Sequence, residues 1–264
     1  MYAVLPRAAY ACVARRCPAW AGVPKTHGVK SFLDEHSYYT PEFAANTPDI
    51  SGYIDQVVSV TNQGYANSGV PLVAMVHCIE AAPITENIPS FGKLFDKFKR
   101  MKSTIKALRG GADAAALLVT KMSVCGVASF NGIASRSTIS VTVKTCAVGT
   151  FSFGHEIGHN IGLQHELNPK KNINKNYPYG HGNHFEEGYR TILAGSKGVR
   201  VNYYSSPNVI FPETGTPTGV AGISDNARLL MENRFAMADI GDESTPCLPT
   251  SSGQTIYMFP TPSK

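Results

Sequence analysis

The sequence contains no run of about 18 apolar residues, the length that a membrane-spanning helix needs, so no membrane span is expected. No internal repeat is visible, and the cysteines do not show the CxxC spacing of a zinc ribbon. Charged residues make up only 16% of the 264 residues, whereas 43% are apolar. A chain of this length and composition can bury a substantial core, which excludes a disordered protein and indicates one compact domain.

The basic residues are unevenly distributed. The formal net charge is +5, and a sizeable share of the lysines and arginines falls within residues 93–109. Apolar residues recur there every three or four positions, which predicts an amphipathic helix with a lysine-rich outer face. They are Leu94, Phe98, Met101, Ile105 and Leu108. We favour a solvated helix face over a patch for nucleic acid or an anionic surface, so no nucleic acid is expected among the partners.

Neither end of the chain predicts a folded element. Residues 1–13 are mildly apolar, but Arg7 interrupts them and no small-residue cleavage site follows, so a signal peptide is not convincing. We interpret residues 1–30 as a leader or a pro-segment remnant, which leaves open whether the amino terminus is complete. Residues 241–264 are rich in Ser, Thr and Pro, and we expect a disordered tail.

Three histidines are concentrated within residues 155–165. On a helix, His155 and His159 lie four residues apart and hence on one face, where two neutral imidazoles can reach one metal ion. Gly162 can adopt a positive φ, end the helix and turn the chain until His165 supplies a third ligand. Three protein ligands leave the fourth position open for water, which is typical of a catalytic zinc site.

Glu156 follows the first of these histidines without being a predicted ligand. A carboxylate at that point can accept a proton from water that zinc has acidified, and can later pass it to the leaving amine. A metal-dependent peptidase with Zn²⁺ as its cofactor is therefore the leading interpretation. Five fixed residue types within an eleven-residue window should arise by chance in a chain of this length with odds on the order of one in 10,000 or less. The better alternative is a degenerate site that keeps its ligands without turnover, or a metal held only for folding.

The periodicity of apolar residues predicts alternating strands and helices. We expect strands at residues 32–39, 70–79, 114–120, 127–130 and 137–144, and further helices at 49–66 and 225–238. Thr150 or Ser152 can cap the helix that carries the first two histidines. The last helix is expected to bury Ala227, Leu230, Met231, Phe235 and Ala238.

The eleven residues from His155 to His165 match the signature HExxHxxGxxH, and the chain resembles the reprolysin-like branch of the metzincin zinc metalloendopeptidases, with similarity to bacterial peptidyl-Asp metallopeptidases. The resemblance covers residues 32–240. Further segments resemble the family's landmarks in the same order, namely residues 37–42, 61–69, 111–113, 125–128, 189–194 and 201–207.

The fold implied by this resemblance is α/β (α+β). It is a metzincin-like zincin with a twisted five-stranded mixed sheet, an active-site helix and a small loop-rich C-terminal subdomain. We therefore expect an upper catalytic subdomain with the zinc helix at residues 31–165, and a lower catalytic subdomain with a Met-turn-like region at residues 166–240.

The resemblance also implies the roles of site residues. His155, His159 and His165 would bind Zn²⁺, and Glu156 would be the general base of an endopeptidase. Where the family places the methionine of its Met-turn, this chain has Leu193, a swap of similar volume that costs under about 1.5 kcal/mol and predicts a softer floor under the site. A second departure is Glu166, where the family typically carries aspartate.

The fourth strand is implied to lie at the lower edge of the sheet. Its unpaired backbone groups could bind an extended substrate by β-augmentation. The expected residues are Gly126, Val127, Ala128, Ser129 and Phe130. The alternative is an ordinary edge strand that a loop covers.

Six cysteines are present, at positions 12, 17, 78, 125, 146 and 247. The family carries two cysteines at the positions of Cys125 and Cys146, so the resemblance implies a disulfide there, with unpaired buried thiols as the alternative. A disulfide implies an oxidising compartment and hence a secreted, extracellular protein. Cys17 resembles the pro-segment thiolate that plugs the zinc of some latent metzincins, although we favour an ordinary cysteine.

Further polar residues remain open. His181 and His184 are expected at the surface or behind the ligands, because three histidines already complete the metal set. Cleavage beside aspartate would require a cationic pocket, which Arg190 or Arg200 could supply. A protein or peptide substrate and a monomeric state are expected. The alternative is a catalytically impaired, metzincin-like protein-binding module, and a basic surface-binding protein ranks last.

Overall fold

The computed structural model describes residues 31–168, 174–186, 188–195 and 197–241. The leader or pro-segment predicted for residues 1–30 lies outside the described residues, as does the predicted tail from residue 242 onward. The division into subdomains at residue 165 stays a prediction. Within the described ranges, no helix is both long and apolar enough to cross a membrane.

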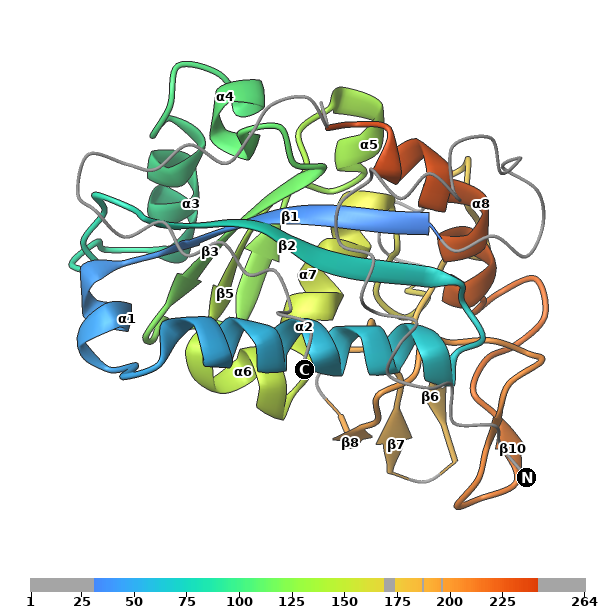
Figure 1. Cartoon of the computed structure of the whole chain (residues 1–264). Coiled ribbons are helices and arrows are strands. Elements are labelled where there is room, and N and C mark those ends of the chain that lie inside the picture. The colour runs from blue at the N-terminus through green and yellow to red at the C-terminus, as the bar shows by residue number, and fades with distance from the viewer. Residues whose placement is uncertain (1–30, 169–173, 187, 196, 242–264) are drawn as a thin grey trace, which may run out of the picture.

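A five-stranded sheet with the strand order β2-β1-β3-β5-β4 lies at the centre of the fold (Figure 1). Four strands are parallel, namely β1 (Ser31–Tyr39), β2 (Leu72–Ala81), β3 (Ala114–Val119) and β5 (Ile139–Val143). The short strand β4 (Gly126–Ala128) pairs with β5 in the antiparallel sense and forms one edge. The mixed sheet expected from the sequence is therefore confirmed, with its fourth strand at the edge.

Helices cover both faces of this sheet. The central strand β3 is buried at all six positions, and its side chains alternate between two hydrophobic clusters. On one face lie α2 (Ile50–Asn67), α7 (Ser152–Ile161) and α8 (Asn226–Ala238). On the other lie α3 (Phe91–Lys99) and α4 (Ile105–Arg109). Short helices α1 (Pro41–Ala45), α5 (Gly132–Ser135) and α6 (Lys144–Gly149) complete the layers.

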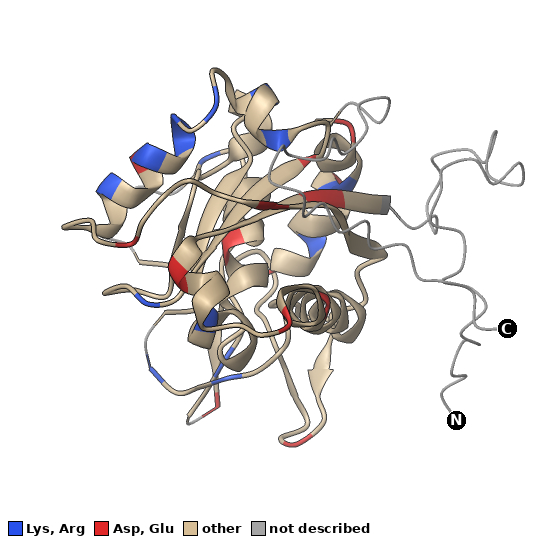
Figure 2. Ribbon diagram, turned by 60° about the vertical axis from the view of Figure 1, so that its left-hand side comes forward, with Lys and Arg blue, Asp and Glu red and all other residues tan. Residues whose placement is uncertain are grey.

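The single helix predicted over residues 93–109 is wrong, because the segment forms two helices, α3 and α4. Helix α3 ends at Lys99, and the Thr104 side chain accepts a hydrogen bond from the Ala107 backbone, which starts a new helix. The apolar residues keep the same spacing across this break because both helices pack on the same face of the sheet. Figure 2 shows lysines and arginines on the outer side of this layer, as the solvated-face interpretation expects. Arg109 at the end of α4 is the exception, because it is buried.

The start of α7 also differs from expectation. Neither Thr150 nor Ser152 caps it; the N-cap residue is Phe151, with a φ of 55° and no side-chain cap. The unpredicted helix α6 ends immediately upstream, so the chain must reverse through a left-handed residue before α7 begins. The two hydroxyls bond to each other at 2.9 Å instead.

The stripe predicted for α8 is correct only in part. Ala227 and Leu230 are buried, but Met231 is 40% exposed, whereas Arg234 and Met237 are buried. The buried face thus includes the charged residue Arg234, which a pattern of hydrophobic residues does not predict, whereas the expected Phe235 and Ala238 are half-buried.

The described residues between α7 and α8 form mainly loops with very short strands. They are β6 (His184–Phe185), β7 (Tyr189–Arg190), β8 (Val199–Arg200), β9 (Ile210–Phe211) and β10 (Thr216–Pro217). The buried Tyr204 fastens this region to the core, because it stacks on Tyr65 of α2 and donates a hydrogen bond to the Gly154 carbonyl of α7 at 3.0 Å.

Glu35 of β1 is fully buried, and its carboxylate accepts a hydrogen bond from Ser37 at 2.5 Å. Burial raises the pKa of Glu35 to about 8, from 4.5. The unfolded chain therefore loses this proton first, and the free energy of unfolding should fall as pH rises from about 4.5 to about 8.

We predict that Glu35→Gln removes a contribution on the order of a few kcal/mol to this fall. Urea unfolding at pH 5.5 and pH 8.5 measures it. The exposed Glu213 gives the control, because Glu213→Gln should keep the pH dependence of the unmutated chain. An equal pH dependence in Glu35→Gln would contradict the prediction.

Candidate metal centre

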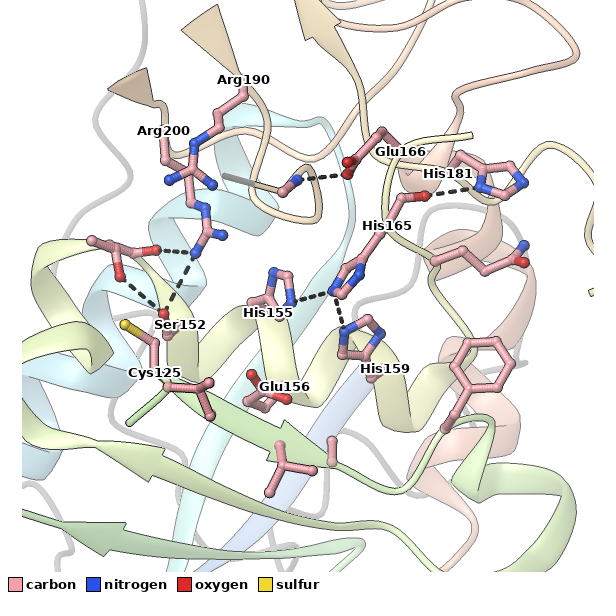
Figure 3. Close-up of a pocket in the computed structure, with 18 of the residues that line it drawn as sticks. Cys125, Ser152, His155, Glu156, His159, His165, Glu166, His181, Arg190 and Arg200 are labelled. Carbon is pink, nitrogen blue, oxygen red and sulfur yellow. Dashed lines mark hydrogen bonds between the residues drawn. The ribbon is translucent and has the colours of Figure 1, made fainter. Parts of the chain in front are cut away.

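Helix α7 and the turn after it bring the three predicted histidines together. His155 and His159 project from one side of α7, and His165 approaches from the following loop (Figure 3). Gly162 ends the helix with a φ of 106°, and the Leu163 backbone N–H bonds to the Gly158 carbonyl at 2.9 Å. The reversal expected at Gly162 is therefore present.

The imidazoles meet through their Nε2 atoms. The Nε2 of His165 lies 3.1 Å from that of His155 and 3.0 Å from that of His159. On the opposite side of each ring, Nδ1 of His155 lies 2.7 Å from the Ile192 carbonyl and Nδ1 of His159 lies 2.8 Å from the Leu163 carbonyl. A carbonyl can only accept, so each Nδ1 carries the proton and each Nε2 keeps its lone pair.

This donor set fits a zinc ion. Burial is the main cause that lowers the pKa of His155 well below its ordinary value and that of His159 to about 4. Both rings are thus neutral near pH 7, as metal ligands must be. Nitrogens that bind zinc tetrahedrally at roughly 2.0 to 2.1 Å lie about 3.3 Å apart, close to the spacings found here. Among the described residues, these histidines form the one cluster with metal-ligand geometry.

Glu156 lies beside the cluster on the side of α7 that faces β4 (Figure 3). Its side chain is only 4% exposed, and burial raises its pKa to about 8, an effect that the charge of Arg200 opposes. Space for the carboxylate depends on a glycine in the strand, because a Cβ at Gly126 would lie 2.7 Å from Cγ of Glu156. The glycine of the edge strand therefore gives the glutamate its room.

The predicted substrate strand is shorter than expected, since β4 ends at Ala128 and Phe130 lies beyond it with 51% of its surface exposed. The Cys125 carbonyl accepts a backbone hydrogen bond from β5, and the Ser129 N–H donates one to β5. Because bonding direction alternates along an antiparallel strand, the backbone groups of Gly126 and Ala128 face the open edge.

Leu193 is fully buried against α7, since a Cβ at Gly158 would lie 3.2 Å from its Cδ2. It directly follows Ile192, whose carbonyl orients His155. An apolar side chain of nearly the volume of methionine thus occupies this position under the helix.

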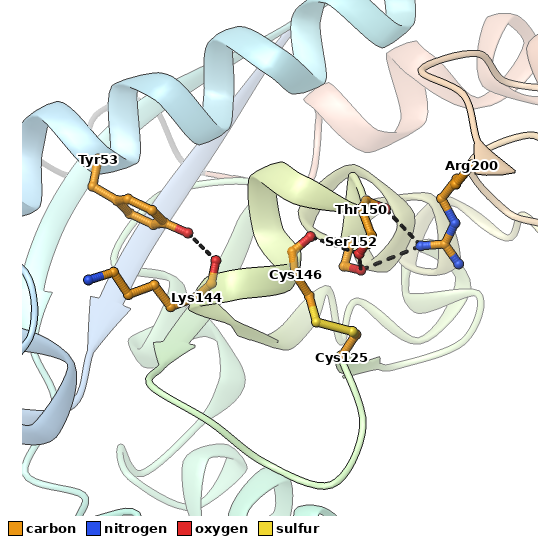
Figure 4. The surroundings of a disulfide bond; sticks show 7 residues. All are labelled: Tyr53, Cys125, Lys144, Cys146, Thr150, Ser152 and Arg200. Carbon is orange, nitrogen blue, oxygen red and sulfur yellow. Dashed lines mark hydrogen bonds between the residues drawn. A yellow bond between two sulfur atoms is a disulfide. The ribbon is translucent and has the colours of Figure 1, made fainter. Parts of the chain in front are cut away.

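The predicted disulfide between Cys125 and Cys146 is confirmed, with Cα atoms 5.5 Å apart. It joins the residue before β4 to α6 (Figure 4). Cys125 also lines the cleft, so the bridge lies within reach of the site.

A cleft of about 760 Å³ opens over the histidines, and two arginines line the end nearest the start of α7. Arg200 donates to the Thr150 carbonyl at 2.8 Å and to the Ala194 carbonyl at 3.2 Å, and Arg190 donates to the same Ala194 carbonyl at 2.8 Å. Burial and the neighbouring Arg190 lower the pKa of Arg200 to about 10, so it stays charged at neutral pH. No carboxylate of a described residue lies in salt-bridge distance of Arg200.

The other candidate residues take different places. His181 is buried, and its Nδ1 lies 2.8 Å from the His165 carbonyl, so it supports the loop that carries the third histidine. His184 is exposed, and neither of them belongs to the metal cluster. Glu166 accepts a hydrogen bond from the Gly195 backbone at 2.6 Å, which ties the two loops together. That Arg200 donates hydrogen bonds to Thr150 and Ser152 could not be predicted from the sequence, because these contacts span about 50 residues.

Comparisons with known proteins agree with this geometry. The family model described as Metallo-peptidase family M12B Reprolysin-like matches residues 51–166. A Peptidyl-Asp metalloendopeptidase of Stenotrophomonas maltophilia is 31% identical over 74% of this chain and 49% of its own length. One of Pseudomonas fragi is 34% identical over 39% of this chain and 67% of its own length.

A third relative of the same name, from Xanthomonas campestris, is 29% identical over 72% of this chain and 47% of its own length. This chain thus spans about half the length of the first relatives that it matches. A solved structure titled "Structure of a chaperone-substrate complex" aligns with a TM-score of 0.63 at 19% identity, covering 80% of this chain and 36% of that one. That likeness shows the fold alone.

Metal removal should destabilise the chain. A ligand that binds only the folded state contributes about 2.7 kcal/mol at 100 times its dissociation constant, so a chelator should lower the Tm and added zinc should restore it. His159→Ala should abolish stoichiometric zinc in an elemental analysis, whereas His184→Ala, which changes an exposed histidine, should retain it. Zinc retained by His159→Ala, or lost from His184→Ala, would contradict the assignment of the metal ligands.

Proposed function

This chain belongs to the reprolysin-like metallopeptidases of family M12B, and on that premise we propose that it is a zinc endopeptidase that hydrolyses peptide bonds of proteins. The observation that carries the proposal is the convergence of three Nε2 atoms beside a buried glutamate on the floor of an open cleft. Because the chain matches about half the length of its first relatives, the activity is our inference for this chain.

In this proposal His155, His159 and His165 hold the metal, and Glu156 is the general base. A zinc ion bound there supplies the positive charge that acidifies water and polarises the peptide carbonyl. Glu156 accepts the proton of the attacking water and passes it to the nitrogen of the leaving amine. Its buried setting favours this role, since desolvation makes the carboxylate a stronger base.

The substrate would lie along β4. The outward backbone groups of Gly126 and Ala128 offer the hydrogen bonds of an added strand, and Phe130 offers an exposed ring 6.3 Å from that of His159. We propose that the stretch from Gly126 to Phe130 aligns an extended peptide with its scissile bond over the metal. Leu193 would support the zinc helix from below, as the Met-turn methionine does in the family.

The relatives are named for cleavage at aspartate, and we propose that this chain also prefers an acidic side chain. Arg200 is the residue that would bind it, because it lines the cleft as a half-buried cation without a salt-bridge partner among the described residues. The carbonyls of Thr150 and Ala194 hold its guanidinium in place. Pre-organised guanidinium groups bind carboxylates strongly and with defined geometry.

We further propose a secreted, monomeric protein that acts on proteins or peptides. The Cys125–Cys146 disulfide supports an oxidising compartment. The alternative, an impaired protein-binding module, predicts a zinc-loaded chain that cleaves nothing. Hydrolysis of a denatured protein that a chelator stops and zinc restores would exclude that alternative.

Replacing Glu156 by Gln should lower kcat by at least about 100-fold, since general-base catalysis contributes typically 100- to 10,000-fold. Zinc content should stay unchanged, because the glutamate is not a ligand in this proposal. Peptide hydrolysis measured alongside elemental analysis tests both points. Activity that survives in Glu156→Gln would remove the general-base assignment.

Arg200→Met should reduce cleavage at acidic residues about ten- to a hundredfold, the value of a charge-assisted hydrogen bond lost from the cleft. Mass spectrometry of a digested peptide library measures the cleavage profile. Arg100→Met, which removes an exposed arginine at the end of α3, is the matched control and should leave the profile intact. An unchanged acidic preference in Arg200→Met would refute its role in specificity.

A further inference from the structure

Asn160 is the residue of α7 directly after His159, and it is fully buried. Its side-chain nitrogen donates to the Ser129 carbonyl at 2.8 Å and to the Ile139 carbonyl at 3.1 Å. These carbonyls lie where β4 has just ended and β5 begins. One amide group therefore joins the zinc helix to both members of the antiparallel pair.

The contact replaces a missing rung of the ladder. Ser129 donates its N–H to the Ile139 carbonyl at 3.0 Å, so a regular pair would return a bond from the Ile139 N–H to the Ser129 carbonyl. The Ile139 N–H instead bonds to Ser137 at 3.1 Å. Asn160 supplies the donor that the Ser129 carbonyl would otherwise lack, and it does so from the helix that carries the metal ligands.

The other end of β4 is fixed independently. The Cys125–Cys146 disulfide ties it to α6, and the Val143 N–H bonds to the Cys125 carbonyl at 2.9 Å. The outward-facing backbone of Gly126 and Ala128 lies between these two attachments. The distance between this backbone and the metal ligands is therefore set by the disulfide at one end. At the other end it is set by Asn160 together with the Asn131 N–H, which bonds to the His159 carbonyl at 2.9 Å.

We propose that Asn160 is a positioning residue for the substrate, one that holds the edge strand at the height at which an extended peptide can pair with it. The inference rests on the proposed function, because it concerns the peptide that the same cleft would bind. Hydrogen bonds weaken steeply as their angle departs from linear, so a strand that tilts away from α7 loses its pairing with the peptide. The histidines and Glu156 stay in place.

The chain offers a matched control at the opposite edge of the sheet. Asn62 of α2 donates to the Ala74 carbonyl of β2 at 2.9 Å and accepts from the Ala74 N–H at 2.7 Å. Like Asn160, it is a helix asparagine that bonds to an edge strand, but β2 lies at the edge remote from β4. Substituting either asparagine should therefore lower the stability of the fold, whereas only substituting Asn160 should weaken the pairing with a peptide.

The test measures peptide binding without turnover, in the full chain with Glu156→Gln. The probe is a fluorescein-labelled, extended peptide with one aspartate, together with copies that are N-methylated at one backbone nitrogen each. Fluorescence anisotropy gives each Kd, and elemental analysis and thermal unfolding give the zinc content and Tm of every variant.

Adding Asn160→Asp, which puts an acceptor against the two carbonyls, should weaken binding of the unmodified peptide about tenfold, whereas Asn62→Asp should leave it unchanged. The N-methyl copy that loses a pairing bond should bind about tenfold more weakly in the parent. In the variant that carries Asn160→Asp, the N-methyl copy should bind almost as well as the unmodified peptide, since the same pairing bonds are already broken.

If Asn160→Asp does not fold, Asn160→Ala provides the same comparison. Three results would overturn the inference. The first is that N-methylation weakens binding as much in the Asn160 variants as in the parent. The others are an equal loss of affinity in Asn62→Asp and no binding of the extended peptide at all. The proposed function fails separately, through an unmutated chain that hydrolyses no peptide, because the binding measurement requires no turnover.

Discussion

The site depends on holding three imidazole nitrogens close to one another. The Nε2 atom of His165 lies 3.1 Å from that of His155 and 3.0 Å from that of His159, close to the spacing of nitrogens that share one zinc ion. Two carbonyls orient the rings from behind, one from Leu163 in the turn and one from Ile192 in the loop-rich region. Tyr204, which bonds to the Gly154 carbonyl, keeps that region against α7. The loops after the helix therefore take part in building the metal centre.

The same helix organises the cleft through its other faces. Glu156 points towards β4 and needs the space at Gly126, while Asn160 and the disulfide hold that strand near it. At the amino end of α7, Arg200 leaves one end of the cleft positive. A substrate peptide whose acidic side chain binds at that end would have its neighbouring peptide bond above the histidines. The proposed catalytic chemistry and the proposed preference for acidic substrates would thus have a common origin in how one short helix is packed.

The metal centre could be predicted from sequence because its spacing is local. His155, His159 and the turn at Gly162 follow from helical periodicity and backbone geometry within eleven residues. Contacts between distant segments could not be read in this way. Neither the direction of Arg200 nor the bonds of Asn160 to Ser129 and Ile139 leaves a periodic trace. The break between α3 and α4 was missed for the opposite reason, since one apolar pattern continues across two helices.

X-ray absorption at the zinc edge of the purified chain tests the central claim most directly, because it reports the atoms bound to the metal. The account predicts a first shell of nitrogen and oxygen alone, at roughly 2.0 to 2.1 Å, with the outer-shell scattering of imidazole rings. Sulfur at about 2.3 Å would place the metal on cysteines, and a spectrum without imidazole scattering would place it away from the three histidines. Either result would contradict the account.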